Sequence, residues 1–291
     1  MARRRWKKSI VSLLSEPMFA RLLPTHHLAL LPTRWVLQPA GGGAANTFTA
    51  DFAAGADVAA MLTSLADLLE KQGVSGRLRV TLSHHHVRLF LAPAPPAWLN
   101  PAEMRVWLDA ALTTALGDGA EKSDKANKDG KGGGWQLAWD LTPPGQPIVV
   151  AAMANALRQG LSDLCQSRGI KLVSARPWLD AAWQRRRRQL GHASGWYALL
   201  EPKRQVLLRL HNGRIVGVRQ RQISNDAAAE LERLLARECL LANLPVGGDL
   251  WLERTGAVSD PGMQADWSRL GGRFSLHELA GPMDHAQAML Q

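Results

Sequence analysis

The most constraining feature of this chain is a single order of secondary-structure elements that occurs twice. In both halves, the hydrophobic pattern predicts three short strands, then a helix, then another strand. The elements expected in the first copy are strands at His27–Leu31, Trp35–Gln38 and Thr47–Phe52, a helix at Asp57–Gln72 and a strand at Arg77–Leu82. Those expected in the second copy are three strands within Trp196–Ile223, a helix at Asp226–Leu241 and a strand at Leu250–Glu253.

Such a duplicated unit predicts an α/β protein with mixed sheets, because hairpins give antiparallel pairs and helical crossovers give parallel pairs. It is the layout of an actin-like fold, in which two ribonuclease H-like lobes each follow the order βββαβαβ. A doubly wound nucleotide-binding fold is the competing interpretation. That fold requires a glycine-rich turn leading from a strand straight into a helix, whereas Gly41, Gly42 and Gly43 separate two strands.

The expected domain organisation is a basic tail at residues 1–21, a first lobe at 22–190 and a second lobe at 191–291. The first lobe carries an inserted small subdomain at about 83–147. This insertion contains a loop at 117–134 that we expect to be flexible, because it has no apolar residue larger than alanine. Further expected elements are a strand at Val87–Leu91, a helix at Pro101–Leu116, paired strands at Trp135–Leu141 and Ile148–Met153, a helix at Ala154–Arg168, a strand at Lys171–Ala175 and a helix at Pro177–Leu190.

The formal net charge is +10, and the positive residues cluster in two places. One cluster is the tail, with Arg3, Arg4, Arg5, Lys7 and Lys8, and the other is Arg185–Arg188. A solvated tail and a helix end, where the macrodipole favours cations, would explain both clusters without a ligand. As a binding surface, the tail favours anionic lipid head groups over nucleic acid, because no helix-turn-helix, zinc-finger or stacking pattern accompanies the charge.

Two further observations concern the cellular compartment. No apolar run approaches the roughly 18 residues that a membrane span requires. The two cysteines, Cys165 and Cys239, lie in separate helical patterns and lack a metal-type spacing, which fits buried thiols in a reducing cytoplasm.

Several short segments resemble PilM-like proteins, which are actin-like assembly components of type IV pilus, mannose-sensitive pilus and type II secretion platforms. The similar segments are Arg79–Leu91, Trp98 with the helix at Ala102–Leu116, Ile170–Trp183, and Trp196–Gln222 with its Glu201-Pro202 pair. The resemblance covers most of residues 22–280.

This resemblance implies a cytoplasmic scaffold, peripheral at the inner membrane, that binds the short cytoplasmic segment of a bitopic, PilN-like membrane protein. It also implies an indirect connection to a motor ATPase. Two alternatives stay open at this point: an active ATP-binding enzyme of the actin or sugar-kinase fold, and a nucleic-acid-binding protein.

The turns that hold phosphate in nucleotide-hydrolysing members of the wider actin fold have the pattern Asp-x-Gly. Aspartate acts there through a metal ion, and glycine lets backbone N–H groups approach phosphate. Here the first turn contains Thr33 and Arg34, and the second is Glu201-Pro202-Lys203, in which Pro202 lacks an N–H group. We therefore expect a pseudo-ATPase with no cofactor. Nucleotide binding without hydrolysis stays open, because Lys203 could attract phosphate as a point charge.

A candidate partner-binding groove combines Trp98 and Trp107 with Arg88, Leu89 and Phe90. Aromatic residues next to a proline-rich stretch can accept an extended segment, although the same residues are equally typical of a core. Four other tryptophans fall within strand patterns and are expected to be buried or half-buried: Trp35, Trp139, Trp196 and Trp251.

Other candidate sites are weaker. His84-His85-His86 is a candidate set of metal ligands. However, adjacent residues of a strand point to opposite faces, and zinc normally takes three or four protein ligands. We interpret it as a polar turn between two strands. Glu201 and Asp140 could be paired carboxylates, yet nothing in the sequence brings them together, and Gly-x-Ser-x-Gly does not occur. We therefore assign no catalytic residue and no metal site.

Overall fold

The computed structural model describes residues 24–42, 46–96, 98–116, 134–139, 145–223, 226–255, 266–279 and 285–290. These residues form two compact units. The first takes the described parts of Met1–Leu82 and Ala92–Pro177, and the second those of Ser83–Leu91 and Trp178–Gln291. The expected division at residue 190 differs from this one. The division expected from the sequence places 178–190 in the first lobe and 83–91 in an insertion of that lobe. In the structure, both segments belong to the second unit. The tail at 1–21 and the loop at 117–133 lie outside the described residues.

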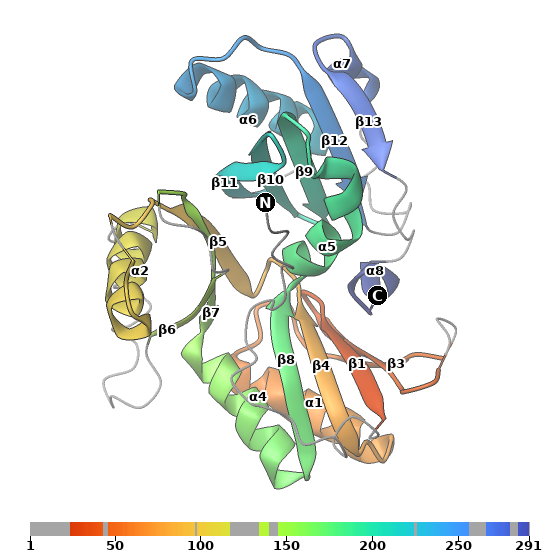
Figure 1. Ribbon diagram of the computed structural model, residues 1–291. Coiled ribbons are helices and arrows are strands. Elements are labelled where there is room, and N and C mark those ends of the chain that lie inside the picture. The colour runs from red at the N-terminus through yellow and green to blue at the C-terminus, as the bar shows by residue number, and fades with distance from the viewer. Residues whose placement is uncertain are drawn as a thin grey trace. The chain divides into compact units, whose positions relative to one another are not determined.

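The first unit contains a five-stranded mixed sheet in the order β3-β2-β1-β4-β8 (Figure 1). Strand β1 (Thr25–Leu30) pairs antiparallel with β2 (Arg34–Gln38), and β2 pairs antiparallel with β3 (Phe48–Asp51). On the other side of β1, strands β4 (Gly76–Leu82) and β8 (Ile170–Pro177) run parallel to it. Hairpins therefore build one half of the sheet and crossovers the other half.

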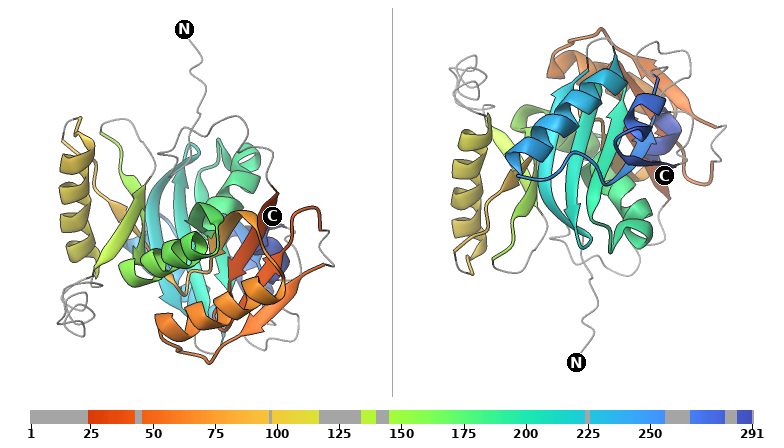
Figure 2. Two further views of the ribbon diagram at one scale, coloured as in Figure 1. Left: turned by 90° about the horizontal axis from the view of Figure 1, so that it is seen from below. Right: turned by 90° about the horizontal axis from the view of Figure 1, so that it is seen from above.

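Two helices, α1 (Val58–Lys71) and α4 (Asn155–Ser167), pack on this sheet and against each other (Figure 2, left). Helix α1 begins at the N-cap Asp57, whose carboxylate accepts the Ala60 N–H at 2.8 Å. Its buried residues recur at helical spacing, which is why the sequence pattern identifies it: Met61, Leu65, Leu68 and Leu69.

The first unit also contains helix α2 (Pro101–Leu116) and the antiparallel strands β6 (Trp135–Trp139) and β7 (Ile148–Ala154). The residue before α2, Asn100, accepts the N–H groups of Ala102 and Glu103, and the Glu103 carboxylate accepts the Asn100 N–H in return. This reciprocal pair follows the logic of a capping box and fixes where the helix starts.

The second unit repeats the order of the first in the sheet β11-β10-β9-β12-β13. Strands β9 (Gly195–Glu201), β10 (Arg204–His211) and β11 (Arg214–Gln222) form two antiparallel hairpins. Strands β12 (Asp249–Arg254) and β13 (Ser275–Leu279) then lie parallel to β9. The duplicated layout predicted from the sequence is confirmed, although the pattern had assigned no particular residues to β13.

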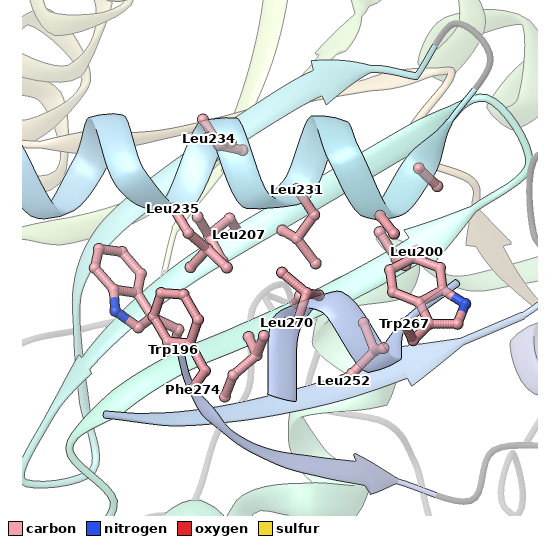
Figure 3. Close-up of a cluster of buried hydrophobic side chains, with 14 of the residues drawn as sticks. Trp196, Leu200, Leu207, Leu231, Leu234, Leu235, Leu252, Trp267, Leu270 and Phe274 are labelled. Carbon is pink, nitrogen blue, oxygen red and sulfur yellow. The ribbon is translucent and has the colours of Figure 1, made fainter. Parts of the chain in front are cut away.

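Helix α6 (Ala227–Leu241) and the short helix α7 (Ser268–Gly271) cover one face of this second sheet (Figure 2, right). Figure 3 shows Leu231 and Leu235 of α6 pointing toward the strands, where they meet Trp196 and Leu207. Successive residues of β9 alternate between faces, so Tyr197, Leu199 and Glu201 point away from α6.

Helix α5 (Trp178–Leu190) packs on that opposite face, where Trp183 contacts Tyr197 at 6.4 Å between ring centroids. The C-terminal helix α8 (His285–Leu290) contacts α5. The second unit also includes Ser83–Leu91, which contains all of strand β5 (Val87–Ala92) except its last residue.

Candidate functional site

The candidate site is the turn between β9 and β10, which corresponds to the second phosphate turn expected from the sequence. Glu201 and Arg204 are paired across the hairpin, and Pro202 and Lys203 form its two-residue loop. Lys203 has φ +60°, in the left-handed region that favours glycine. Proline followed by a left-handed residue is the arrangement of a type II turn. The backbone of Lys203 therefore adopts the conformation that glycine would supply, with a side chain in its place.

The carboxylate of Glu201 is fully buried, and both of its oxygens are engaged by the chain itself. Oε2 accepts the hydroxyl of Ser83, and Oε1 accepts the backbone N–H of His84 at 3.0 Å. The Nδ1 atom of His84 lies against Oε1 as well. A buried carboxylate requires such partners, because leaving it without hydrogen bonds costs several kcal/mol.

The histidine run is a turn folded over the Glu201 hairpin. His84 is fully buried, and its Nε2 accepts the backbone N–H of Leu179 at 3.1 Å, which leaves the ring proton on Nδ1, facing Glu201. The Nε2–H of His85 donates to the Pro202 carbonyl at 2.8 Å, and burial lowers the pKa of this imidazole. The His86 N–H donates to the Ser83 carbonyl at 3.0 Å, so the three histidines lie in the turn between β4 and β5.

Gln220 of β11 also holds the segment that begins at Ser83, through hydrogen bonds to its backbone. Its Nε2 donates to the carbonyls of His84 at 2.6 Å and Val87 at 2.9 Å, while its Oε1 accepts the Leu89 N–H at 2.9 Å. Nothing in the sequence signals this role, because a glutamine on a strand is ordinarily a solvent-facing residue. Ser83, His84 and Gln220 together hold residues 83–89 on the hairpin.

The first turn is also a poor match for a phosphate site. Thr33 and Arg34 are exposed at its tip. The Leu31 N–H donates to the Arg34 carbonyl at 2.9 Å, and the Phe52 N–H donates to the Thr33 carbonyl at 2.8 Å. Among the residues of these two turns, which the structure describes in full, the one carboxylate is the engaged Glu201. The residues of these two turns therefore do not fit a magnesium ion that bridges to phosphate.

A second buried polar cluster explains two of the clustered arginines. Glu253 of β12 is fully buried and pairs with Arg185 at 3.0 Å and with Arg186 at 2.9 Å. Its Oε2 also accepts the Tyr197 hydroxyl at 2.8 Å. A helix end therefore explains only Arg187 and Arg188, which lie in the last turn of α5. Arg185 and Arg186 lie mid-helix and neutralise a carboxylate on the sheet beneath.

The five residues of the expected partner-binding groove have different environments. Trp98 is 80% exposed, and Trp107 is half-buried with its Nε1–H donating to the Pro93 carbonyl at 3.4 Å. Leu89 and Phe90 are buried, and Arg88 is exposed. The two tryptophans belong to the first unit and Arg88, Leu89 and Phe90 to the second. The basic residues expected to contact lipid, Arg3, Arg4, Arg5, Lys7 and Lys8, lie outside the described residues, as does Asp140.

The described segments contain no group of three or more histidine, cysteine, aspartate or glutamate side chains that could hold a metal ion. Across the same segments, no helix combines the length and hydrophobicity needed to cross a bilayer.

No protein-family model and no curated protein matches the sequence. Solved structures do match. A Bacteroides thetaiotaomicron protein with an actin-like ATPase fold and unknown function superposes with a TM-score of 0.58 at 9% identity, over 95% of this chain and 99% of that one. A PilM–PilN type IV pilus biogenesis complex superposes with a TM-score of 0.55 at 14% identity, over 88% of each chain.

The chain has an actin-like fold. Identities this low show the fold alone, so the actin-like fold class predicted from the duplicated layout is confirmed, and the resemblance to PilM-like proteins in particular stays a prediction. Proteins of this fold include ATPases and proteins of unknown function, so the role of this chain has to be argued from its own residues.

Proposed function

We propose that this protein is a non-catalytic actin-like scaffold in the cytoplasmic platform of a type IV pilus or type II secretion-like machine. In this role it is peripheral at the inner membrane and binds the short cytoplasmic segment of a bitopic, PilN-like assembly protein. Its connection to the motor ATPase is indirect, through the platform. The likeness in fold to the PilM–PilN pilus biogenesis complex supports the proposal.

The observation that carries the non-catalytic part is the environment of Glu201. Nucleotide hydrolysis in this fold depends on a carboxylate that acts through a metal ion, and on glycine N–H groups that approach phosphate. In this protein the carboxylate is buried under Ser83 and His84, and the glycine position holds Lys203. Lys203 can still attract phosphate as a point charge, so the proposal excludes hydrolysis rather than binding.

For the partner contact, we propose Trp98 as the anchor. Its side chain is 80% exposed, and tryptophan is among the residues most enriched in interface hot spots. Val106 on the adjacent helix α2 is also exposed, and Trp107 supplies a half-buried neighbour. Arg88, Leu89 and Phe90 belong to the other unit, where we propose a separate partner contact at Arg88, the exposed residue of the three.

The test uses the full chain and a peptide copied from the cytoplasmic segment of a one-span membrane protein encoded next to it. Binding is measured by fluorescence anisotropy for the wild type, for Trp98→Ala and for Leu240→Ala. Leu240 is a matched control, because it is equally exposed but lies on α6 of the second unit. We expect Trp98→Ala to weaken binding about tenfold or more, and Leu240→Ala to leave it unchanged.

Equal peptide binding by the wild type and by Trp98→Ala would show that Trp98 is not part of the interface. No binding by the wild type would contradict the scaffold role for this neighbour. Circular dichroism of each variant shows whether the fold is intact, so that a loss of binding is not confused with unfolding.

A further inference from the structure

A hollow of about 340 Å³ lies in the second unit between helix α6 and the edge of the sheet formed by β10 and β11. None of its lining residues belongs to the Glu201-Pro202-Lys203 turn. Its lining residues are Gln205, Arg221, Gln222, Glu230, Arg233, Leu234 and Arg237.

The sequence builds this hollow from two regular patterns. Gln205 and Arg221 are direct partners in the β10–β11 register, so both side chains point to the face that α6 covers. On α6, Glu230, Arg233, Leu234 and Arg237 recur at intervals of three, four and seven residues and therefore share one side of the helix. Leu234 closes the floor, because it also belongs to the buried core (Figure 3).

The lining is positively charged and its charges are incompletely matched. It contains three arginines and one glutamate. The neighbouring Arg219 shows how α6 satisfies an arginine of β11, since its Nε donates to Glu238 at 2.8 Å. Within the part of the chain that the structure describes, Arg221 and Arg237 have no such carboxylate. Three guanidinium groups in one hollow favour a ligand with carboxylates or other anionic groups.

The floor of the hollow also contains a hydrogen-bond acceptor that lacks a donor among the described residues. Gln205 is only 2% exposed, and its Oε1 has no hydrogen-bond donor among the described residues. A buried acceptor in this state costs about 1–3 kcal/mol, which a donor on a ligand would recover. A ligand that brings a donor as well as negative charge would satisfy both features of the lining. A polypeptide with acidic side chains supplies both, whereas inorganic phosphate and the phosphates of a nucleic acid offer mainly acceptors.

The spacing of the arginines fits an extended chain. Arg233 and Arg237 are one helical turn apart, or about 6 Å along the axis of α6. Side chains on one face of an extended strand repeat at about 6.8 Å, so alternate acidic residues could each meet one arginine. We propose that this hollow binds an extended acidic segment of a partner protein. The inference goes beyond the proposed function, since it concerns a second surface and a partner segment of defined charge.

The test measures the anisotropy of a fluorescein-labelled ten-residue peptide of alternating glutamate and threonine, mixed with the full chain. A peptide with lysine in place of glutamate is the control ligand. Arg237→Glu reverses one charge inside the hollow, and Arg214→Glu makes the same charge change on an exposed part of β11 outside it. Gln205→Leu removes the buried acceptor.

We expect the glutamate peptide to bind at least tenfold more tightly than the lysine peptide. Arg237→Glu should weaken its binding about tenfold, and Gln205→Leu severalfold, while Arg214→Glu changes it less than twofold. Equal losses in Arg237→Glu and Arg214→Glu would reduce the effect to net charge and overturn the proposal. Displacement of the peptide by inorganic phosphate or oligothymidylate at lower concentration than unlabelled peptide would also overturn it, in favour of a general anion site. Thermal unfolding of each variant separates lost binding from lost folding.

Discussion

Tyr197 is the single tyrosine of the chain, and its environment makes it a reporter of the buried Glu253 cluster. Its hydroxyl donates to a carboxylate that Arg185 and Arg186 hold in place. Burial, followed by the negative charge of Glu253, raises the pKa of this phenol well above its ordinary value, and the two arginines oppose the shift only in part.

We expect an alkaline titration followed by tyrosinate absorbance to show no ionisation near pH 10 while the protein is folded. Because the pKa of the phenol is higher in the folded state, its contribution to stability is complete below about pH 10 and is lost as the pH rises further. The unfolding free energy should therefore fall above about pH 10. The chain in concentrated guanidinium chloride is the control, where the phenol should titrate near its ordinary value. A folded protein that ionises Tyr197 near pH 10 would contradict the buried cluster.

The residues of the candidate site were only partly predictable. The absence of Asp and Gly from the two turns is visible in the sequence, because those roles depend on residue type. The partners of Glu201 are not visible, since Ser83 lies 118 residues away and His84 117 residues away. Nothing local distinguishes a serine or histidine that will meet a distant carboxylate from one in an ordinary polar turn.

The secondary-structure elements were predicted where apolar periodicity is strong. Helix α6 is an example, with core residues at helical spacing and an N-cap at Asp226 that accepts the Ala229 N–H at 3.0 Å. Strand β13 was not assigned, because Ser275–Leu279 has little apolar alternation and lies at the sheet edge. An edge strand buries less surface, so its pairing leaves a weaker signal in the sequence.

The side chains of α6 that face the sheet should contribute strongly to the stability of the second unit, whereas those on its exposed side should not. Leu231→Ala removes a fully buried side chain and should lower the unfolding free energy by about 2–5 kcal/mol, through lost burial and a residual cavity. Leu240→Ala on the exposed side of the same helix should change it by less than about 0.5 kcal/mol. Urea unfolding of both variants measures the difference. Similar values for the two would contradict the orientation of α6.

The whole molecule consists of two units with the same strand order, and this duplication was predicted because it depends on the succession of elements rather than on any one residue. The division between the units was less accessible. Residues 83–91 and α5 join the second unit through contacts such as His84 with Glu201 and Arg185 with Glu253, which involve residues far apart in the sequence.

The basic residues at the start of the chain give a prediction for the molecule at the membrane. We propose that Arg3, Arg4, Arg5, Lys7 and Lys8 contact anionic lipid, at about 1 kcal/mol for each residue near the surface. Vesicles that contain phosphatidylglycerol should co-sediment with the protein at low salt and lose it as salt screens the charges. Deletion of residues 2–8 should abolish this binding. Equal retention of the deleted and intact chains, or retention on neutral phosphatidylcholine vesicles, would contradict the proposal.

Ser83 and His84 donate hydrogen bonds to both oxygens of the Glu201 carboxylate, and we infer that this carboxylate therefore cannot support nucleotide hydrolysis. The most direct measurement is phosphate release from ATP and magnesium by the wild type, with Glu201→Gln as the comparison. We predict no turnover above the protein-free background in either protein, even at concentrations where a labelled nucleotide binds. Steady turnover by the wild type that is lost in a folded Glu201→Gln variant would contradict the claim and make this chain an active ATPase.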